Sequence, residues 1–275
     1  MTKTFYVSDL DGTLLNKSAE IPPYTKETLK RFIENGGHFT VATARALDTV
    51  LHILDGIPLH IPIVLLNGVC IYDIMKQRYE KIETIDPACL NSIFKTLADF
   101  DVTGFLYTLE NEDIAFYYEN LDAEQRKRFH DDRSGKYGRI YTQVASFTDL
   151  CEKEVVYFSC CDTYAHLAPV YEKLKTEARL HVEFYQDTYY KGFWLMEVCS
   201  VAASKYNAVM ELKKKYGFDR IVSFGDNLND LPLFQASDES YAVANAKNEV
   251  KEMATAVIGS NEDNGVAKWL EANAH

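Results

Sequence analysis

The stretch FYVSDLDGTLL, residues 5–15, decides how this sequence is interpreted. The apolar residues Phe5 to Val7 predict a short buried strand of a parallel sheet. Two carboxylates one residue apart, Asp9 and Asp11, follow this strand. Ligands of open parallel sheets bind beyond the carboxyl ends of the strands, so we expect chemistry at this point. Because two acids so close repel each other, a hard divalent cation is the simplest compensation.

Three simpler interpretations of the stretch remain open. An Asp-Gly pair is common in solvated turns. A calcium loop would use Asp9, Asp11, Thr13 and Glu20, but it needs a glycine where Leu14 stands and a helix before the loop. Asp11 could also cap the N-terminus of a helix, which is compatible with a chemical role.

Composition and charge exclude several classes of partner. The chain has 275 residues, with 41 acidic against 29 basic side chains and a formal net charge of −12. This charge argues against nucleic acid or an anionic membrane surface as the main partner. The six cysteines form no Cys-x-x-Cys pair, and the seven histidines show no metal-ligand spacing. Without a signal segment or an apolar run of membrane-spanning length, we expect a cytoplasmic protein with no membrane partner.

Strands and helices alternate at both ends of the chain. The first part contains a helical segment that ends at Asn35-Gly36-Gly37, and strands over residues 39–42 and 61–66. The alternation resumes at Phe193, where a helix begins after Ser204. The later elements expected are strands at 220–224, 241–244 and 256–258 and a helix at 264–273. This order predicts an α/β fold with a parallel sheet.

The middle of the chain has a different pattern. Its strands are longer, alternate in hydrophobicity and are rich in tyrosine, with helical patterns around residues 87–100 and 163–178. Two close strands within residues 104–118 predict an antiparallel hairpin. We therefore expect an α+β domain inserted into the α/β domain. The expected domains are residues 1–81 with 192–275, and residues 82–191.

Polar residues stand at four strand ends or helix starts. They are Asp9 with Asp11, Thr43, Lys205, and the segment GDNLND at residues 225–230. Each has a simpler explanation. Thr43 could merely begin a loop, and Gly-Asp-Asn is ordinary turn chemistry. A lysine at a helix start is usually solvated, and the helix dipole disfavours Lys205 there. Together they supply carboxylates for Mg²⁺, a hydroxyl and an ammonium for phosphate oxygens, and helix N-termini with free amides. The set therefore favours phosphoryl transfer.

This order of motifs resembles the haloacid dehalogenase superfamily, and the place of the insertion resembles the Cof-type phosphatases. The likeness covers the whole chain and implies a Rossmann-like parallel-sheet core with an inserted α+β cap domain. Two positions depart from the family pattern: Ala44 replaces the glycine of Thr-Gly-Arg, and Tyr206 replaces the glycine of Lys-Gly-x-Ala. Neither change removes a chemical group.

The resemblance implies a Mg²⁺-dependent phosphatase. Asp9 would attack phosphorus and form an aspartyl-phosphate, and Asp11 would act as general acid and base. The other implied roles are metal binding by Asp9, the Asp11 carbonyl and Asp226, phosphate binding by Leu10, Thr43, Ala44, Lys205 and Asn229, and support from Asp230, Asn67 and Gly68.

The expected substrate is a small phosphorylated metabolite, first a sugar phosphate and then a cofactor phosphate such as pyridoxal phosphate or flavin mononucleotide. The inserted domain would be a lid whose residues 186–191 contact the leaving group, and the protein would be a monomer or a weak homo-oligomer. A phosphomutase on the same fold and a non-catalytic binding module are the alternatives. Phosphate release favours the phosphatase, and dependence on a sugar bisphosphate favours the mutase.

Overall fold

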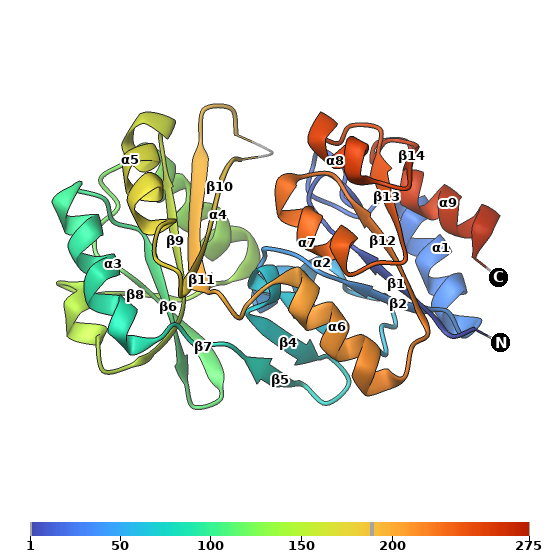
Figure 1. Cartoon of the computed structure of the whole chain (residues 1–275), viewed down its shortest axis with the longest axis horizontal. Helices are drawn as coiled ribbons and strands as arrows, with labels where there is room; N and C mark the ends of the chain where they lie inside the picture. Colours follow the sequence, from blue (N-terminus) through green and yellow to red (C-terminus); the bar gives the residue numbers. More distant parts are fainter. Residues whose placement is uncertain (1, 188–189, 275) are drawn as a thin grey trace. The chain divides into compact units, whose positions relative to one another are not determined.

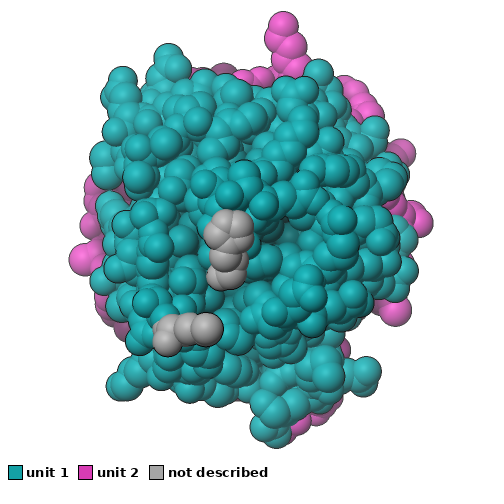
Figure 2. All heavy atoms as spheres, turned by 90° about the vertical axis from the view of Figure 1, so that its right-hand side faces the viewer, with its two compact units in different colours: residues 1–81, 204–275 teal, residues 82–203 magenta. Residues whose placement is uncertain are grey.

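The chain forms two compact units, coloured separately in Figure 2. The structure, a computed structural model, describes residues 2–187 and 190–274. Unit 1 combines Met1–Lys81 with Ser204–His275, and unit 2 is Ile82–Ala203. Residues 188–189 of the stretch expected to contact the leaving group lie outside the described residues.

Unit 1 contains a five-stranded parallel sheet with the order β14-β13-β12-β1-β2 (Figure 1). Its strands are β1 (Thr4–Ser8), β2 (His38–Val41), β12 (Arg220–Gly225), β13 (Glu239–Val243) and β14 (Ala256–Ile258). Strand β1 lies between two neighbours and is almost wholly buried, which explains its continuous apolar run. Ser8 pairs with Phe224, so the carboxyl ends of β1 and β12 lie side by side. The predicted α/β parallel-sheet fold is confirmed.

Among the helices of unit 1, α1 packs against α9, and α7 packs against both α6 and α8. Their bounds are α1 (Pro23–Glu34), α2 (Leu47–Ile53), α6 (Lys205–Tyr216), α7 (Leu231–Gln235), α8 (Asn248–Met253) and α9 (Gly265–Asn273), with 3₁₀ turns η1 (Leu66–Gly68) and η3 (Leu228–Asp230). The apolar face of α6, which includes Val209 and Leu212, packs on Phe5 and Val7 of β1. Among the described residues, no helix combines the length and apolarity that a bilayer span requires.

A second, three-stranded sheet completes unit 1. It consists of β3 (Ile63–Leu65), β4 (Cys70–Asp73) and β5 (Arg78–Ile82), and β3 pairs with β4 in antiparallel fashion. A parallel bridge between Ala42 and Val64 connects β3 to the end of β2. Strands β4 and β5 are not among the expected elements. The chain between them is a short turn, and β5 is only half-buried, so its sequence has no buried apolar run.

Unit 2 is built on a six-stranded sheet with the order β10-β11-β9-β6-β7-β8. Its strands are β6 (Phe105–Glu110), β7 (Asp113–Tyr118), β8 (Tyr141–Gln143), β9 (Glu154–Asp162), β10 (Leu180–Gln186) and β11 (Trp194–Ser200). All pairs are antiparallel except β7 with β8. The expected hairpin joins β6 to β7 through Asn111 and Glu112, which both adopt positive φ as a tight hairpin turn requires.

Helices pack on both faces of this sheet. They are α3 (Pro87–Asp99), α4 (Glu124–Tyr137) and α5 (Tyr164–Leu174), with the 3₁₀ turn η2 (Phe147–Leu150). Leu106 joins the core shared with α3 and α5, while its neighbour Phe105 stacks on Phe129 of α4, so α4 covers the opposite face. Helix α4 is not among the expected helices, because only Arg126 and Phe129 of its residues are buried and it has no apolar stripe.

The boundary expected between residues 191 and 192 differs from the division into units. Strand β11 begins two residues later and pairs with both β9 and β10. Because β11 lies inside the sheet of unit 2, that unit continues to Ala203. Unit 1 resumes at Ser204, whose hydroxyl caps α6 by accepting a hydrogen bond from Asn207 N–H (3.0 Å).

Candidate active site

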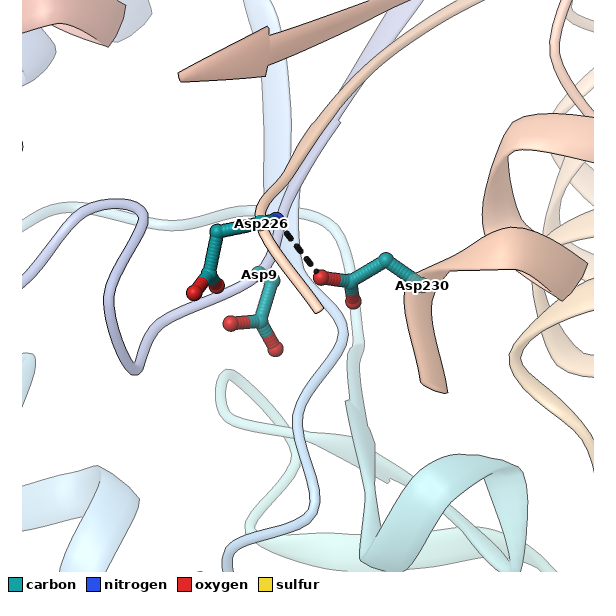
Figure 3. A group of neighbouring side chains, drawn as sticks. All are labelled: Asp9, Asp226 and Asp230. Atoms are coloured by element: carbon teal, nitrogen blue, oxygen red, sulfur yellow. Dashed lines mark hydrogen bonds between the residues drawn. The ribbon is translucent and has the colours of Figure 1, made fainter. Parts of the chain in front are cut away.

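Asp9 lies at the carboxyl end of β1, beside the end of β12. Its N–H donates to Phe224 O (3.0 Å), and the residue is only 5% exposed. Asp226 directly follows β12, and Asp230 lies in the 3₁₀ turn after it. Figure 3 shows the three side chains close together, and one carboxylate oxygen from each lies within 4.8 Å of the others. Carboxylates from two widely separated segments, Asp9 after β1 and Asp226 with Asp230 after β12, therefore form one buried cluster.

Lys205 is the buried cation of this cluster. It is the first residue of α6 and is 1% exposed, and its Nζ donates to Asp9 Oδ1 and to Asp230 Oδ1 at 2.7 Å each. Burial lowers the pKa of Lys205, but the charges of Asp230 and Asp9 more than offset this, so its pKa lies above the ordinary value. Lys205 is therefore held as an ammonium despite the unfavourable helix dipole.

Asp230 connects two motifs through both of its carboxylate oxygens. Its Oδ1 accepts from Lys205, and its Oδ2 accepts from the N–H groups of Asp226 (2.9 Å) and Asn227 (3.1 Å). The side chain is fully buried. Asp230 thereby fixes the position of the Lys205 ammonium relative to the backbone that carries Asp226.

Negative charge exceeds positive charge in the cluster. Burial, together with the charge of Asp230, raises the pKa of Asp9 to about 8 although Lys205 opposes the shift. Burial and the charges of Asp230 and Asp9 also raise the pKa of Asp226 well above its ordinary value. A donor set of hard carboxylate oxygens with uncompensated charge suits a hard divalent cation such as Mg²⁺.

Thr13 and Gly12 determine how the chain after β1 meets Asp226. Thr13 Oγ1 donates to Asp226 Oδ1 (2.9 Å). Gly12 has φ +79°, and a Cβ there would lie 2.4 Å from Asp226 Oδ2, so only glycine allows this approach. Asn245 Nδ2 donates to Gly12 O (2.7 Å). From the sequence, Thr13 is expected only as a possible calcium ligand, and no role is predicted for Asn245.

Asp11 is held by Arg45 through a bidentate ion pair. Arg45 Nε donates to Asp11 Oδ2 (2.7 Å), and Nη2 donates to Oδ1 (2.6 Å). The backbone N–H of Arg45 donates to Thr43 Oγ1 (3.2 Å). No role is predicted for Arg45 from sequence, although its place two residues after Thr43 was a usable signal. The pair fixes the orientation of the Asp11 carboxylate.

Free backbone donors lie next to these side chains. Within the described part of the chain, the N–H groups of Leu10 and Ala44 have no hydrogen-bond acceptor. Thr43, one residue before Ala44, is fully buried and lies beyond the end of β2. Unpaired amides near strand ends favour an anion, because its oxygens satisfy them.

Asn67, Gly68 and Asn229 extend the site. Asn229 Nδ2 donates to Asn67 Oδ1 (3.2 Å), and Asn67 N–H donates to Thr43 O (2.9 Å). Gly68 has φ +100°, and a Cβ there would lie 2.2 Å from the carbonyl oxygen of Ser204. The structure thus connects these residues to Thr43 and to the start of α6, and all expected site residues belong to unit 1.

Sequence and structure comparisons identify related proteins over nearly the full chain. The 5-amino-6-(5-phospho-D-ribitylamino)uracil phosphatase YwtE of Bacillus subtilis is 28% identical, covering 96% of this chain and 95% of the relative. The pyridoxal phosphate phosphatase YbhA of Escherichia coli is 24% identical, covering 98% of each chain. A haloacid dehalogenase-like hydrolase from Bacillus subtilis has a similar structure, with a TM-score of 0.81, 22% identity, and coverage of 98% of this chain and 99% of that one.

The sequence profile of the haloacid dehalogenase-like hydrolases matches residues 6–270, which include both units apart from the ends of unit 1. This match agrees with the resemblance seen in the motifs around Asp9 and Asp226. The chain therefore belongs to the haloacid dehalogenase-like hydrolase family.

Proposed function

We propose that the protein is a Mg²⁺-dependent phosphatase that hydrolyses phosphate monoesters of small metabolites through an aspartyl-phosphate. The observation that carries the proposal is the buried Asp9 carboxylate, which lies 2.7 Å from the Lys205 ammonium and within the carboxylate cluster. The curated relatives described above are named phosphatases, which supports the same reaction.

Asp9 and Asp11 divide the chemistry between them. An Asp9 oxygen attacks phosphorus, the bond from phosphorus to the ester oxygen breaks, and Asp11 gives that oxygen a proton. Asp11 then takes a proton from water, which attacks phosphorus and releases Asp9 with inorganic phosphate. In the structure both Asp11 oxygens accept from Arg45, so one of them would have to leave this ion pair and take up a proton before Asp11 acts as the acid.

The residues present fit a bound Mg²⁺. The Asp9 carboxylate, the Asp11 backbone carbonyl and the Asp226 carboxylate would hold it, and its charge would offset that of the carboxylates and the phosphate. Asp230 completes the cluster by distance, but both of its oxygens already accept hydrogen bonds from the protein. We therefore assign Asp230 to positioning Lys205 rather than to metal binding.

The transferred phosphoryl group would be bound by three side chains and two amides. Lys205 and Thr43 supply an ammonium and a hydroxyl, Asn229 supplies an amide group, and Leu10 and Ala44 supply the unpaired N–H groups. Contacts within unit 1 hold the side chains of Lys205, Thr43 and Asn229, so we expect little reorganisation of these three when charge develops on the phosphate oxygens.

The substrate class follows from the expected cap function and from the relatives' names. Sugar phosphates are the first expectation, and unit 2 would select the leaving group. The two curated relatives are named for phosphate esters attached to a pyrimidine with a ribityl chain and to a pyridine ring. A substrate panel therefore needs sugar phosphates together with phosphate esters that carry a heteroaromatic ring.

The test is release of inorganic phosphate from such a panel by the purified protein with Mg²⁺, beside its Asp9→Asn variant. We expect release by the wild-type protein alone. A dependence on added sugar bisphosphate would identify a mutase instead. Absence of release from every ester, with binding of the esters retained, would identify a binding module.

A further inference from the structure

The carboxyl ends of β13 and β14 lie at the same edge of the sheet as the candidate active site, but no expected site residue follows either strand. Both strands run parallel to β12 and β1 in the order β14-β13-β12-β1-β2. Asn245 comes shortly after β13, and Asn261 comes shortly after β14. Because parallel strands end at one edge of a sheet, these two asparagines can reach the chain that follows β1.

Asn245 connects the chain after β1 to the chain after β14. Its Nδ2 donates to Gly12 O (2.7 Å), and its Oδ1 accepts from Asn261 N–H (3.0 Å). A side-chain amide that is bonded at both ends has the directions of its donor and its acceptor fixed. Asn245 therefore sets how far Gly12 lies from the backbone at residue 261.

Asn261 holds the other end of the same segment. The residue is buried, and its Nδ2 donates to Leu15 O (2.8 Å). Together the two asparagines bind the carbonyl groups of Gly12 and Leu15, the first and last residues of this short segment. The segment directly follows Asp11, whose backbone carbonyl is one of the Mg²⁺ ligands proposed above.

The loop after β13 also contacts the segment that carries a second proposed metal ligand. Lys247 N–H donates to Asp226 O (2.9 Å). Thr13 Oγ1 donates to Asp226 Oδ1 (2.9 Å), which joins the two ligand-bearing segments directly. The loop thus binds the backbone at Gly12 and at Asp226, on either side of this hydrogen bond. It therefore helps to fix the distance between the two segments.

We propose that Asn245 is a positioning residue of the metal site. It holds Gly12, and thereby the Asp11 carbonyl, at the distance from Asp226 that Mg²⁺ requires, and this role rests on the Mg²⁺ binding proposed above. Mg²⁺ requires a nearly octahedral set of oxygen ligands at about 2.0–2.1 Å. Groups that orient such ligands affect metal affinity without touching the ion. Asn245 is exposed, so its replacement should cost the fold little.

Metal titration of the full-length protein in the absence of substrate tests this role. Isothermal titration calorimetry gives the affinities of the wild-type protein and of Asn245→Ala for Mg²⁺ and for Ca²⁺. We expect the variant to bind Mg²⁺ about tenfold more weakly. The loss of Ca²⁺ affinity should be smaller, because Ca²⁺ tolerates longer and less regular distances to its ligands. A residue that only stabilised the fold would not change the preference between the two ions.

Asn248→Ala is the matched control, because Asn248 is an exposed asparagine at the first position of α8. This variant should bind both ions as the wild-type protein does, and the melting temperature shows whether each variant is folded. If Asn245→Ala does not fold, Asn245→Ser takes its place, since serine is too short to bridge Gly12 and residue 261.

Two results would overturn the positioning role alone. They are an Mg²⁺ affinity of the folded Asn245 variant within about twofold of wild type, and equal losses of affinity for Mg²⁺ and Ca²⁺. Absence of Mg²⁺ binding by the wild-type protein would overturn the proposed metal role, and the positioning role with it.

Discussion

The two units bury acidic side chains in opposite ways. In unit 1, Asp9, Asp226 and Asp230 lie together, and the Lys205 ammonium donates to Asp9 and Asp230, so negative charge remains in excess. In unit 2, Glu197 is buried in the middle of β11, where Tyr185 OH donates to its Oε2 (2.9 Å). Burial raises the pKa of Glu197 to about 7, although hydrogen bonds from Tyr157 and Tyr185 oppose the shift. A carboxyl that is bonded to tyrosine hydroxyls can be neutralised by a proton, whereas a cluster of carboxylates at strand ends favours a metal ion.

The largest effect should come from Asp9→Asn. Asparagine has the same shape but cannot form the acyl phosphate, so turnover should fall by roughly 10⁴-fold or more, while the fold remains. Phosphate release and circular dichroism measure the two quantities. Turnover within tenfold of wild type would rule out a covalent intermediate at Asp9.

Removal of divalent cations should be nearly as severe. Chelation should abolish phosphate release, and added Mg²⁺ should restore it, because Asp9 and Asp226 would otherwise face the substrate with uncompensated charge. Asp226→Asn should raise the Mg²⁺ concentration needed for half-maximal activity more than it lowers thermal stability. Full activity after exhaustive chelation would contradict the proposed metal role.

Lys205→Ala should cost less, on the order of 2–4 kcal/mol of transition-state stabilisation. Because the ammonium would contact the phosphate and not the alcohol, kcat/KM should fall by a similar factor for every ester tested. Lys214→Ala, at an exposed position on the same helix, is the matched control. A change in substrate ranking in the Lys205 variant would show that the lysine contacts the leaving group.

The pH dependence of stability offers a subtler test of the excess charge. The pKa of Asp9 is about 8 in the folded state against an ordinary value of 3.8. Between these two pH values the folded protein keeps the Asp9 proton and the unfolded chain has lost it. Without divalent cations, the free energy of unfolding should therefore decrease as pH rises from about 4 to about 8. Mg²⁺ should raise the melting temperature more at pH 8 than at pH 6. An equal rise at both values would contradict the linkage.

Glu197→Gln should have the smallest effect on the chemistry and sharpens the contrast between the units. Its folded pKa of about 7 exceeds the ordinary 4.5, so wild-type stability should fall between these pH values, and glutamine should flatten that part of the curve. Turnover of a small generic ester such as p-nitrophenyl phosphate should not change. Glu154→Gln, at the exposed start of β9, serves as the control. An unchanged pH profile in the Glu197 variant would show that this carboxyl is not the group that titrates.

The sequence was most informative about the polar residues that directly follow the strands of the parallel sheet. Residues at the ends of β1 and β12 could be placed together because parallel strands end at one edge of a sheet. Lys205 is the first residue of α6 and Asp230 is the last residue of the turn that follows β12, and both lie in the same cluster. The place of Arg45 after Thr43 was a signal for the site, but its bond to Asp11 and the Thr13–Asp226 hydrogen bond depend on side-chain directions, which strand order does not give.

Elements without an apolar pattern were missed for a different reason. Helix α4 is mostly charged and buries few side chains, and β5 is only half-buried, so periodicity gave no signal for either. The apolar run of β11 looked like a core strand, but its antiparallel partners are β9 and β10. Hydrophobicity indicates that a strand is buried, not which sheet contains it.

Gly68 contacts the backbone at the point where the chain re-enters unit 1 after the insertion. Unit 2 ends at Ala203. The next two residues are Ser204, the N-cap residue of α6, and Lys205, which belongs to the site. A force on the returning strand would therefore reach the ammonium within two residues. The close contact between Gly68 and the Ser204 carbonyl, which leaves no space for a Cβ, anchors the backbone at this point. A side chain at position 68 would displace the Ser204 carbonyl, and with it the start of the helix that carries Lys205.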